Sequence, residues 1–167
     1  MFEAIAGAGV QHFETRFHAD ENLHLTEILD IANKYPSDIS EAENLKLMFP
    51  VTIEEIQSIL TVSKNDKSLG SDGIPVEVFR ALFDVLGSDL LRVIEDSRCS
   101  GKIPVVFNTT FIALIPKNDC PKSFDDFRPI SLCKFVYKII GKIISTRIKK
   151  ILGRFISKER FGFLPGR

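Results

Sequence analysis

Two cationic side chains that can bind a phosphate flank a loop near residue 120. Lys117 directly follows one short apolar run and Arg128 begins a second, so a hairpin would place both near its loop end. An arginine at such a position needs an anion. Arg128 can form a salt bridge with Asp125 or Asp126, or its guanidinium can hold a phosphate through two parallel N–H bonds. The spacing alone favours the salt bridge.

A second set of cations repeats at helical spacing. Lys134, Lys138 and Lys142 are four residues apart and therefore lie on one face of a helix. Such a stripe, with Arg147 and two further lysines beyond it, can follow a nucleic-acid backbone. The alternative is a solvated helix face, which the charge pattern alone favours.

The charges of the chain are unevenly distributed. Residues 1–100 carry 8 Lys and Arg against 18 Asp and Glu, whereas residues 101–167 carry 14 against 4, and the net charge is zero. A basic final third indicates an anionic partner, most simply a nucleic acid. Alternatively, the acidic and basic parts face each other within one fold, and composition does not decide between these alternatives.

Residue types suited to other chemistry lack the necessary spacing. The three histidines, at positions 12, 18 and 24, form no metal set with a cysteine or glutamate. No G-x-S-x-G nucleophile motif is present, and the glycine-containing turn at 69–73 lacks the Lys-Ser/Thr ending of a phosphate-binding loop. The three cysteines are odd in number and fit free thiols in a reducing compartment. We therefore predict no catalytic residue and no metal ligand.

The phosphate-binding candidates require a hairpin followed by a long helix. The apolar run 111–115 predicts a buried strand that Pro116 ends, and residues 127–132 predict its partner. An i, i+3, i+4 pattern of apolar residues predicts the longest helix over 133–152. Its apolar positions are Val136, Ile140, Ile143, Ile144, Ile148, Ile151 and Leu152.

Upstream of the hairpin the sequence predicts several helices. A short amphipathic pattern favours a helix over 23–32, and residues 36–50 resemble a connector with one helical turn. A capping box at Thr52 and Glu55 predicts a helix that ends near residue 62. Further helices are expected from Pro75 to about residue 86, and over 89–99 with Ser88 as the N-cap and Gly101 at the end.

The length and composition indicate a folded, non-membrane protein. A chain of 167 residues with 44% hydrophobic residues can bury a core, and no apolar run approaches the roughly 20 residues of a membrane span. The first residues lack the pattern of a signal peptide. We expect an intracellular location without choosing between nucleus and cytoplasm, and no membrane partner.

Several segments together resemble a known family. FIALIPK (111–117) and DFRPISLCKFVYKIIGKII (126–144) are similar to the fingers region of reverse transcriptases from LINE-type non-LTR retrotransposons, plant members especially. FPVTIEEIQSIL (49–60), KSLGSDGIPVEVF (67–79) and ISKERFGFLPGR (156–167) match in the same order, and HFETRF (12–17) resembles the segment that precedes the polymerase. The resemblance thus covers nearly the whole chain.

The resemblance implies an RNA-directed DNA polymerase, a nucleotidyltransferase. It implies an α+β, helix-rich fingers part of a right-hand polymerase, with an antiparallel hairpin at about 110–132 and a long helix at about 133–152. Residues 1–48 would be a helical, linker-like segment, and 49–167 a partial polymerase domain. Partners would be an RNA template, a DNA primer and a deoxynucleoside triphosphate. Lys117 and Arg128 would lie near the triphosphate, and Lys134, Lys138 and Lys142 would help to hold the template.

The sequence departs from the family pattern in three ways. Leu69 stands where the family usually has proline, and Arg160 where it usually has glutamine. The palm, whose aspartates hold two Mg²⁺ ions in the complete enzyme, would follow Arg167 and is missing here. We therefore expect no bound Mg²⁺ and no polymerase activity from this chain alone. Two alternatives are a non-catalytic nucleic-acid-binding fragment and a pseudogene product without function.

Overall fold

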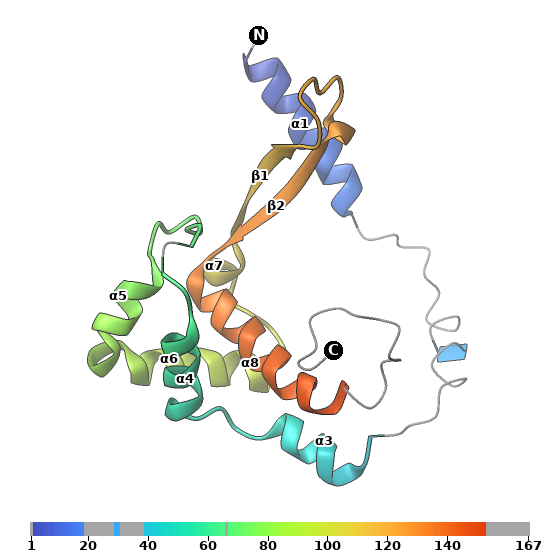
Figure 1. The fold of residues 1–167 in the computed structure, drawn as a ribbon. Helices are drawn as coiled ribbons and strands as arrows, with labels where there is room; N and C mark the ends of the chain where they lie inside the picture. The colour runs from blue at the N-terminus through green and yellow to red at the C-terminus, as the bar shows by residue number, and fades with distance from the viewer. Residues whose placement is uncertain (1, 19–28, 31–38, 66, 153–167) are drawn as a thin grey trace. The chain divides into compact units, whose positions relative to one another are not determined.

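The computed structural model describes residues 2–18, 29–30, 39–65 and 67–152 (Figure 1). The described part is helix-rich and contains one two-stranded antiparallel sheet, as an α+β fold class predicts. In chain order the elements are α1 (Phe2–Phe17), α3 (Glu41–Met48), α4 (Ile53–Val62), α5 (Val76–Ala81), α6 (Phe83–Ser100), α7 (Val105–Asn108), β1 (Thr110–Pro116), the 3₁₀ turn η1 (Phe124–Asp126), β2 (Phe127–Cys133) and α8 (Phe135–Leu152).

The chain divides into two compact units. One consists of residues 1–38 and 114–129, and the other of residues 39–113 and 130–167. Both strands of the hairpin therefore belong in part to each unit. The proposed boundary near residue 48 remains a prediction.

The smaller unit is built on aromatic contacts of α1. Phe13 is buried, and its ring centroid lies 6.3 Å from that of Phe124 in η1. Gly9 makes this packing close, because a Cβ at that position would lie 3.2 Å from the Phe124 ring. The contact joins residues more than 100 positions apart, so no local sequence pattern predicts it.

The larger unit contains the main hydrophobic core. Helix α4 packs against α5, α6 and α8, and Ile56 and Ile139 at their interface are fully buried. Burial of such side chains contributes about 1.5–3 kcal/mol each. The buried cluster consists of Val51, Ile56, Ile59, Leu60, Val76, Phe79, Leu90, Ile94, Val136, Ile139, Ile140 and Ile143.

Polar side chains fix the starts of α3 and α4. The Ser40 hydroxyl accepts a hydrogen bond from the N–H of Glu43, and the Glu43 carboxylate accepts one from the N–H of Ser40. This capping box explains why the expected connector contains a two-turn helix. Helix α4 begins as predicted, with Thr52 accepting from the N–H of Glu55. The predicted return bond from Glu55 is absent there, because that carboxylate binds Arg147 instead.

The break between the next two helices lies five residues before its predicted place. The chain leaves helical geometry at Leu82, and α6 continues through Gly87 and Ser88 as one helix. A Cβ at Gly87 would lie 3.3 Å from the Phe83 ring and 3.5 Å from the Ile53 methyl group. Glycine here therefore serves close packing of α6 on α4, and tertiary contacts override its weak helix propensity. The predicted stop at Gly101 is confirmed, with φ +66°.

The hairpin and the long helix are confirmed, but two burial predictions are wrong. Strand β1 was expected to be buried, yet Phe111 is 58% and Ile115 50% exposed. The described sheet has two strands, so neighbouring strands cannot cover a continuous apolar run. In α8 the predicted core positions Ile144 and Ile148 are also exposed.

Two predictions lie outside the described residues. These are most of the helix expected over 23–32 and the segment 156–167, which includes Arg160. No helix in the part of the chain that the structure describes has the length and apolarity needed to cross a membrane.

Candidate functional site

The register of the hairpin places Lys117 and Arg128 on the same face. The N–H of Lys117 donates to the carbonyl of Asp126 at 2.7 Å, and at the other end the Thr110 hydroxyl lies 3.6 Å from the Cys133 sulfur. Both contacts fit one register, in which Lys117 is opposite Asp126 and each step along β1 is matched on β2. Arg128 is then a diagonal neighbour of Lys117 on the same side of the ribbon, at a typical separation of about 7–8 Å.

The Lys117 side chain holds the loop closed. Its Nζ atom donates to the backbone carbonyl of Asp125 at 2.6 Å, next to the main-chain bond from Lys117 to Asp126. Lys117 remains exposed, and its charge is not paired with an acidic side chain among the described residues. A neutral carbonyl leaves the positive charge of the ammonium group uncompensated, so the group can still attract an anion.

The acidic side chains expected to pair with Arg128 have other partners. The Asp125 carboxylate lies 3.0 Å from Arg16 Nη1 and 3.6 Å from His12 Nε2. The Asp126 carboxylate accepts the N–H groups of Lys122 and Ser123 at 2.8 and 3.1 Å.

Among the described residues, no side chain pairs with the Arg128 guanidinium. The N–H groups of Lys122 and Ser123 lower the pKa of Asp126, so this carboxylate stays charged while it caps its own loop. Within the described ranges Arg128 is exposed and has no hydrogen bond or ion pair. The salt bridge that the spacing favoured is therefore absent. His12, Arg16 and Phe124 complete this arrangement, and sequence spacing gave no sign of them because Arg16 is 109 positions from its partner.

The lysines at 134, 138 and 142 have different surroundings. Lys134 precedes α8, and its Nζ atom donates to the carbonyl of Val106 at 2.6 Å. Lys138 Nζ donates to the carbonyl of Ser68 at 2.8 Å. Lys142 is exposed and has no acidic partner among the described residues. Lys134 and Lys138 thus connect the start of α8 to other segments of the larger unit. Of the three lysines, only Lys142 lies on a solvent-exposed helix face without such a contact.

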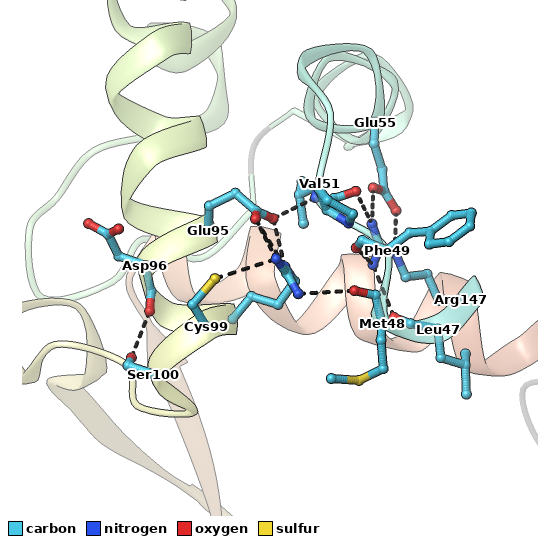
Figure 2. A network of polar contacts seen from close by, with 12 residues as sticks. Leu47, Met48, Phe49, Val51, Glu55, Glu95, Asp96, Cys99, Ser100 and Arg147 are labelled. Atoms are coloured by element: carbon cyan, nitrogen blue, oxygen red, sulfur yellow. Dashed lines mark hydrogen bonds and ion pairs between the residues drawn. The ribbon is translucent and has the colours of Figure 1, made fainter. Parts of the chain in front are cut away.

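Arg147 does not continue this cationic surface. Its side chain is 13% exposed, and its guanidinium forms a two-point ion pair with Glu55, at 2.9 and 2.7 Å (Figure 2). It also donates to the carbonyls of Leu47, Phe49 and Pro50. The sequence-based hypothesis that Arg147 follows a nucleic-acid backbone is wrong, because all of its donors are used inside the protein.

A second arginine, Arg98, also forms a hydrogen bond with the segment that precedes α4. Glu95 accepts hydrogen bonds from Arg98 and from the N–H of Val51, and Arg98 donates to the carbonyl of Met48 at 3.0 Å (Figure 2). The hydrogen bonds from Arg98 are the main cause of the lowered pKa of Glu95, and the Val51 N–H adds to it. These contacts hold residues 47–51 against α6 and α8.

The described residues do not fit a metal site. They contain no group of three or more His, Cys, Asp or Glu side chains that could hold a metal ion. We therefore assign no Mg²⁺ ligand among the described residues.

Comparisons with known proteins give two relatives. No family model matches the chain. The chain is 33% identical over 129 residues to the "Transposon TX1 uncharacterized 149 kDa protein" of Xenopus laevis, with 77% of the chain aligned. It is 30% identical over 117 residues to the "RNA-directed DNA polymerase from mobile element jockey" of Drosophila funebris, with 68% aligned.

The matched part is short compared with these relatives. It spans 10% of the length of the first protein and 13% of the second. The chain is therefore related to a small part of two proteins of mobile genetic elements, one of which is named as an RNA-directed DNA polymerase.

Proposed function

We propose that this chain is the fingers part of a non-LTR retrotransposon reverse transcriptase. In this proposal Lys117 and Arg128 bind the triphosphate of the incoming deoxynucleotide, and α8 lies near the template. The observation that carries the proposal is the Arg128 guanidinium, which has no partner among the described residues and lies on the same hairpin face as Lys117. The similarity to an RNA-directed DNA polymerase supports it.

The chemistry of the two cations suits a polyphosphate. Arg128 can bind two phosphate oxygens through parallel N–H donors, and Lys117 adds a compact charge nearby. Such groups position a nucleotide and neutralise its charge, but they do not supply the metal-assisted phosphoryl transfer of a polymerase. We therefore expect this chain to bind a nucleotide without joining it to a primer.

Binding of dTTP in the presence of EDTA tests the nucleotide site without metal. We expect chemical-shift changes in a ¹H–¹⁵N spectrum to centre on the amides of 117 and 128, and Lys117→Ala/Arg128→Ala to abolish them. Lys122→Ala is the matched control, because Lys122 is exposed in the same loop and its side chain is not placed in the site. Equal shifts in wild type and the double variant would disprove the nucleotide site.

Primer extension tests the expected lack of catalysis. The assay combines this chain with an RNA template, a DNA primer, dNTPs and Mg²⁺. We expect no incorporation by the chain alone. Measurable extension by the purified chain would refute that expectation.

A non-catalytic nucleic-acid-binding role is the second candidate, and exposed Lys142 favours it. Since the amines of Lys134 and Lys138 donate hydrogen bonds to backbone carbonyls, replacing these lysines would also disturb the packing of the larger unit. Lys142→Glu is therefore the cleaner variant. This role predicts that oligonucleotide binding weakens steeply with salt and weakens further in Lys142→Glu. Binding that is independent of salt would argue against it.

A further inference from the structure

A cavity in the larger unit brings together lysines from separate segments. It has a volume of about 360 Å³ and lies between the end of α4, residues 67–77 and the first turns of α8. This volume falls within the general range of about 300–1,000 Å³ for small-molecule sites. Four lysines line it, namely Lys64, Lys67, Lys138 and Lys142, together with one glutamate, Glu77.

Three of these four amines have no acidic partner among the residues that the structure describes. Lys64, Lys67 and Lys142 are exposed and have no acidic partner in the described ranges. Lys138 donates to a neutral carbonyl, that of Ser68, and so joins the two walls of the cavity. Several like charges around one concave site create a positive potential that favours an anion.

The remaining lining of the cavity is apolar. Ile59, Val76, Ile139 and Phe135 contribute to it, and the Phe135 ring lies 5.1 Å from that of buried Phe79. Cationic groups beside an apolar, partly aromatic floor are the usual combination in sites for single-stranded nucleic acids, where amines contact phosphates and rings contact bases.

We propose that this cavity binds one unpaired nucleotide of a single-stranded nucleic acid. Lys64, Lys67 and Lys142 contact its flanking phosphates, and the apolar lining with Phe135 contacts the base. The inference rests on the proposed function, and it extends that function to Lys64 and Lys67. An acidic peptide could also meet the lysines, but the aromatic floor and the polymerase relative favour a nucleic acid.

Fluorescence anisotropy with labelled oligo(dT)₁₂ tests the cationic part. We expect Lys64→Ala/Lys67→Ala/Lys142→Ala to weaken binding on the order of 10-fold and to reduce the slope of log K against log salt by about 2, at about 0.7 for each lost phosphate contact. Lys46→Ala/Lys102→Ala/Lys122→Ala is the matched control, since these lysines do not line the cavity. An unchanged slope in the first triple variant would overturn the proposal.

A pair of valine variants tests the position of the site. Val62 lines the cavity and is 66% exposed, and Val85 on α6 is 72% exposed and lies outside it. Both positions tolerate a charge, so both variants should fold. We expect Val62→Glu to weaken oligo(dT)₁₂ binding by about 5-fold or more and Val85→Glu to change it by less than about 2-fold. Equal effects would place the binding site elsewhere.

An abasic oligomer tests the contact with the base. We expect the affinity for oligo(dT)₁₂ to be at least about 5-fold higher than the affinity for an abasic deoxyribose-phosphate 12-mer. We expect Val62→Glu to reduce this difference in affinity. Equal affinity for the two oligomers would overturn the base-binding part.

Two further outcomes separate this inference from the proposed function. Loss of oligomer binding only in Lys117→Ala/Arg128→Ala would overturn the cavity site and leave the hairpin site standing. Binding of poly-glutamate, but not of oligo(dT)₁₂, with sensitivity to Val62→Glu would assign the cavity to an acidic protein instead. The dTTP experiment, which does not involve the cavity, decides the hairpin site independently.

Discussion

At the scale of single residues, partners decide what each cation can do. Arg147 and Lys142 lie on the same helix, five residues apart. Arg147 is enclosed by a carboxylate and three carbonyls, whereas Lys142 is exposed and lines the cavity. A partly buried guanidinium with all of its donors satisfied serves packing, and an exposed ammonium without an acidic partner is available to a ligand.

Replacement of Arg147 tests its structural role. We expect Arg147→Ala to lower the free energy of unfolding by about 2–3 kcal/mol, because it leaves the Glu55 carboxylate and several carbonyls without donors. Arg92→Ala is the control, since its pair with Asp89 is 72% and 63% exposed, and it should cost less than about 1 kcal/mol. Urea unfolding measures both, and similar losses would contradict the assignment.

Glu95 makes stability depend on pH. Its pKa is lowered in the folded state, chiefly by the hydrogen bonds from Arg98. The associated stabilisation is fully present above the ordinary glutamate pKa of about 4.3, and it is lost as the pH falls through the lower folded-state pKa. Urea unfolding between pH 7 and pH 3 should therefore show a smaller acid loss in Glu95→Gln than in wild type. If the free energies of unfolding of wild type and Glu95→Gln fall in parallel with pH, Glu95 does not contribute to the pH dependence of stability.

At the scale of elements, the 67–75 segment lies against the start of α8. A Cβ at Gly70 would lie 2.6 Å from the Cys133 carbonyl oxygen and from the backbone of Lys134, which cannot move like a flexible side chain. Lys138 adds a hydrogen bond to Ser68 in the same segment. The absence of a side chain at Gly70 and the length of Lys138 together set the distance between this segment and α8.

Two alanine substitutions for glycine are expected to have opposite effects. Gly70→Ala should destabilise the protein by about 1–3 kcal/mol, because the backbone must shift to admit the methyl group. Gly141→Ala in the middle of α8 meets nothing within 4 Å and should stabilise by about 0.5–1 kcal/mol through helix propensity. Thermal unfolding compares them, and a neutral Gly70→Ala would contradict the close contact.

At the scale of the whole molecule, burial is concentrated in the larger unit. Its core joins α4, α5, α6 and α8 into one continuous cluster. A continuous core predicts cooperative unfolding of this unit. Broad, non-cooperative unfolding would instead favour the alternative of a pseudogene product without function.

Two isoleucines of α8 test this core. Ile139 is fully buried, and Ile144 is 51% exposed. We expect Ile139→Ala to lower the free energy of unfolding by about 2–5 kcal/mol, and Ile144→Ala to cost clearly less, because only the first leaves a cavity. Urea unfolding followed by circular dichroism measures both. A broad transition without a defined midpoint in the wild-type chain would contradict the cooperative core.

The sequence determined the elements that local chemistry controls. The start of α4 at Thr52 and the end of α6 at Gly101 follow from side-chain capping and from a positive φ. The apolar period predicted α8 almost to its bounds. Each of these signals acts within a few residues of the chain.

Tertiary structure decided which side chains are available for binding. The sequence could not show that Asp125 pairs with Arg16, that Glu55 binds Arg147 instead of completing a capping box, or that α6 continues through Gly87. The ion-pair partners are 109 and 92 positions apart, and the Gly87 contact depends on packing against α4. The spacing of residues along the chain predicts on which face of an element a side chain lies. Only the folded structure shows which distant groups form ion pairs or hydrogen bonds with it.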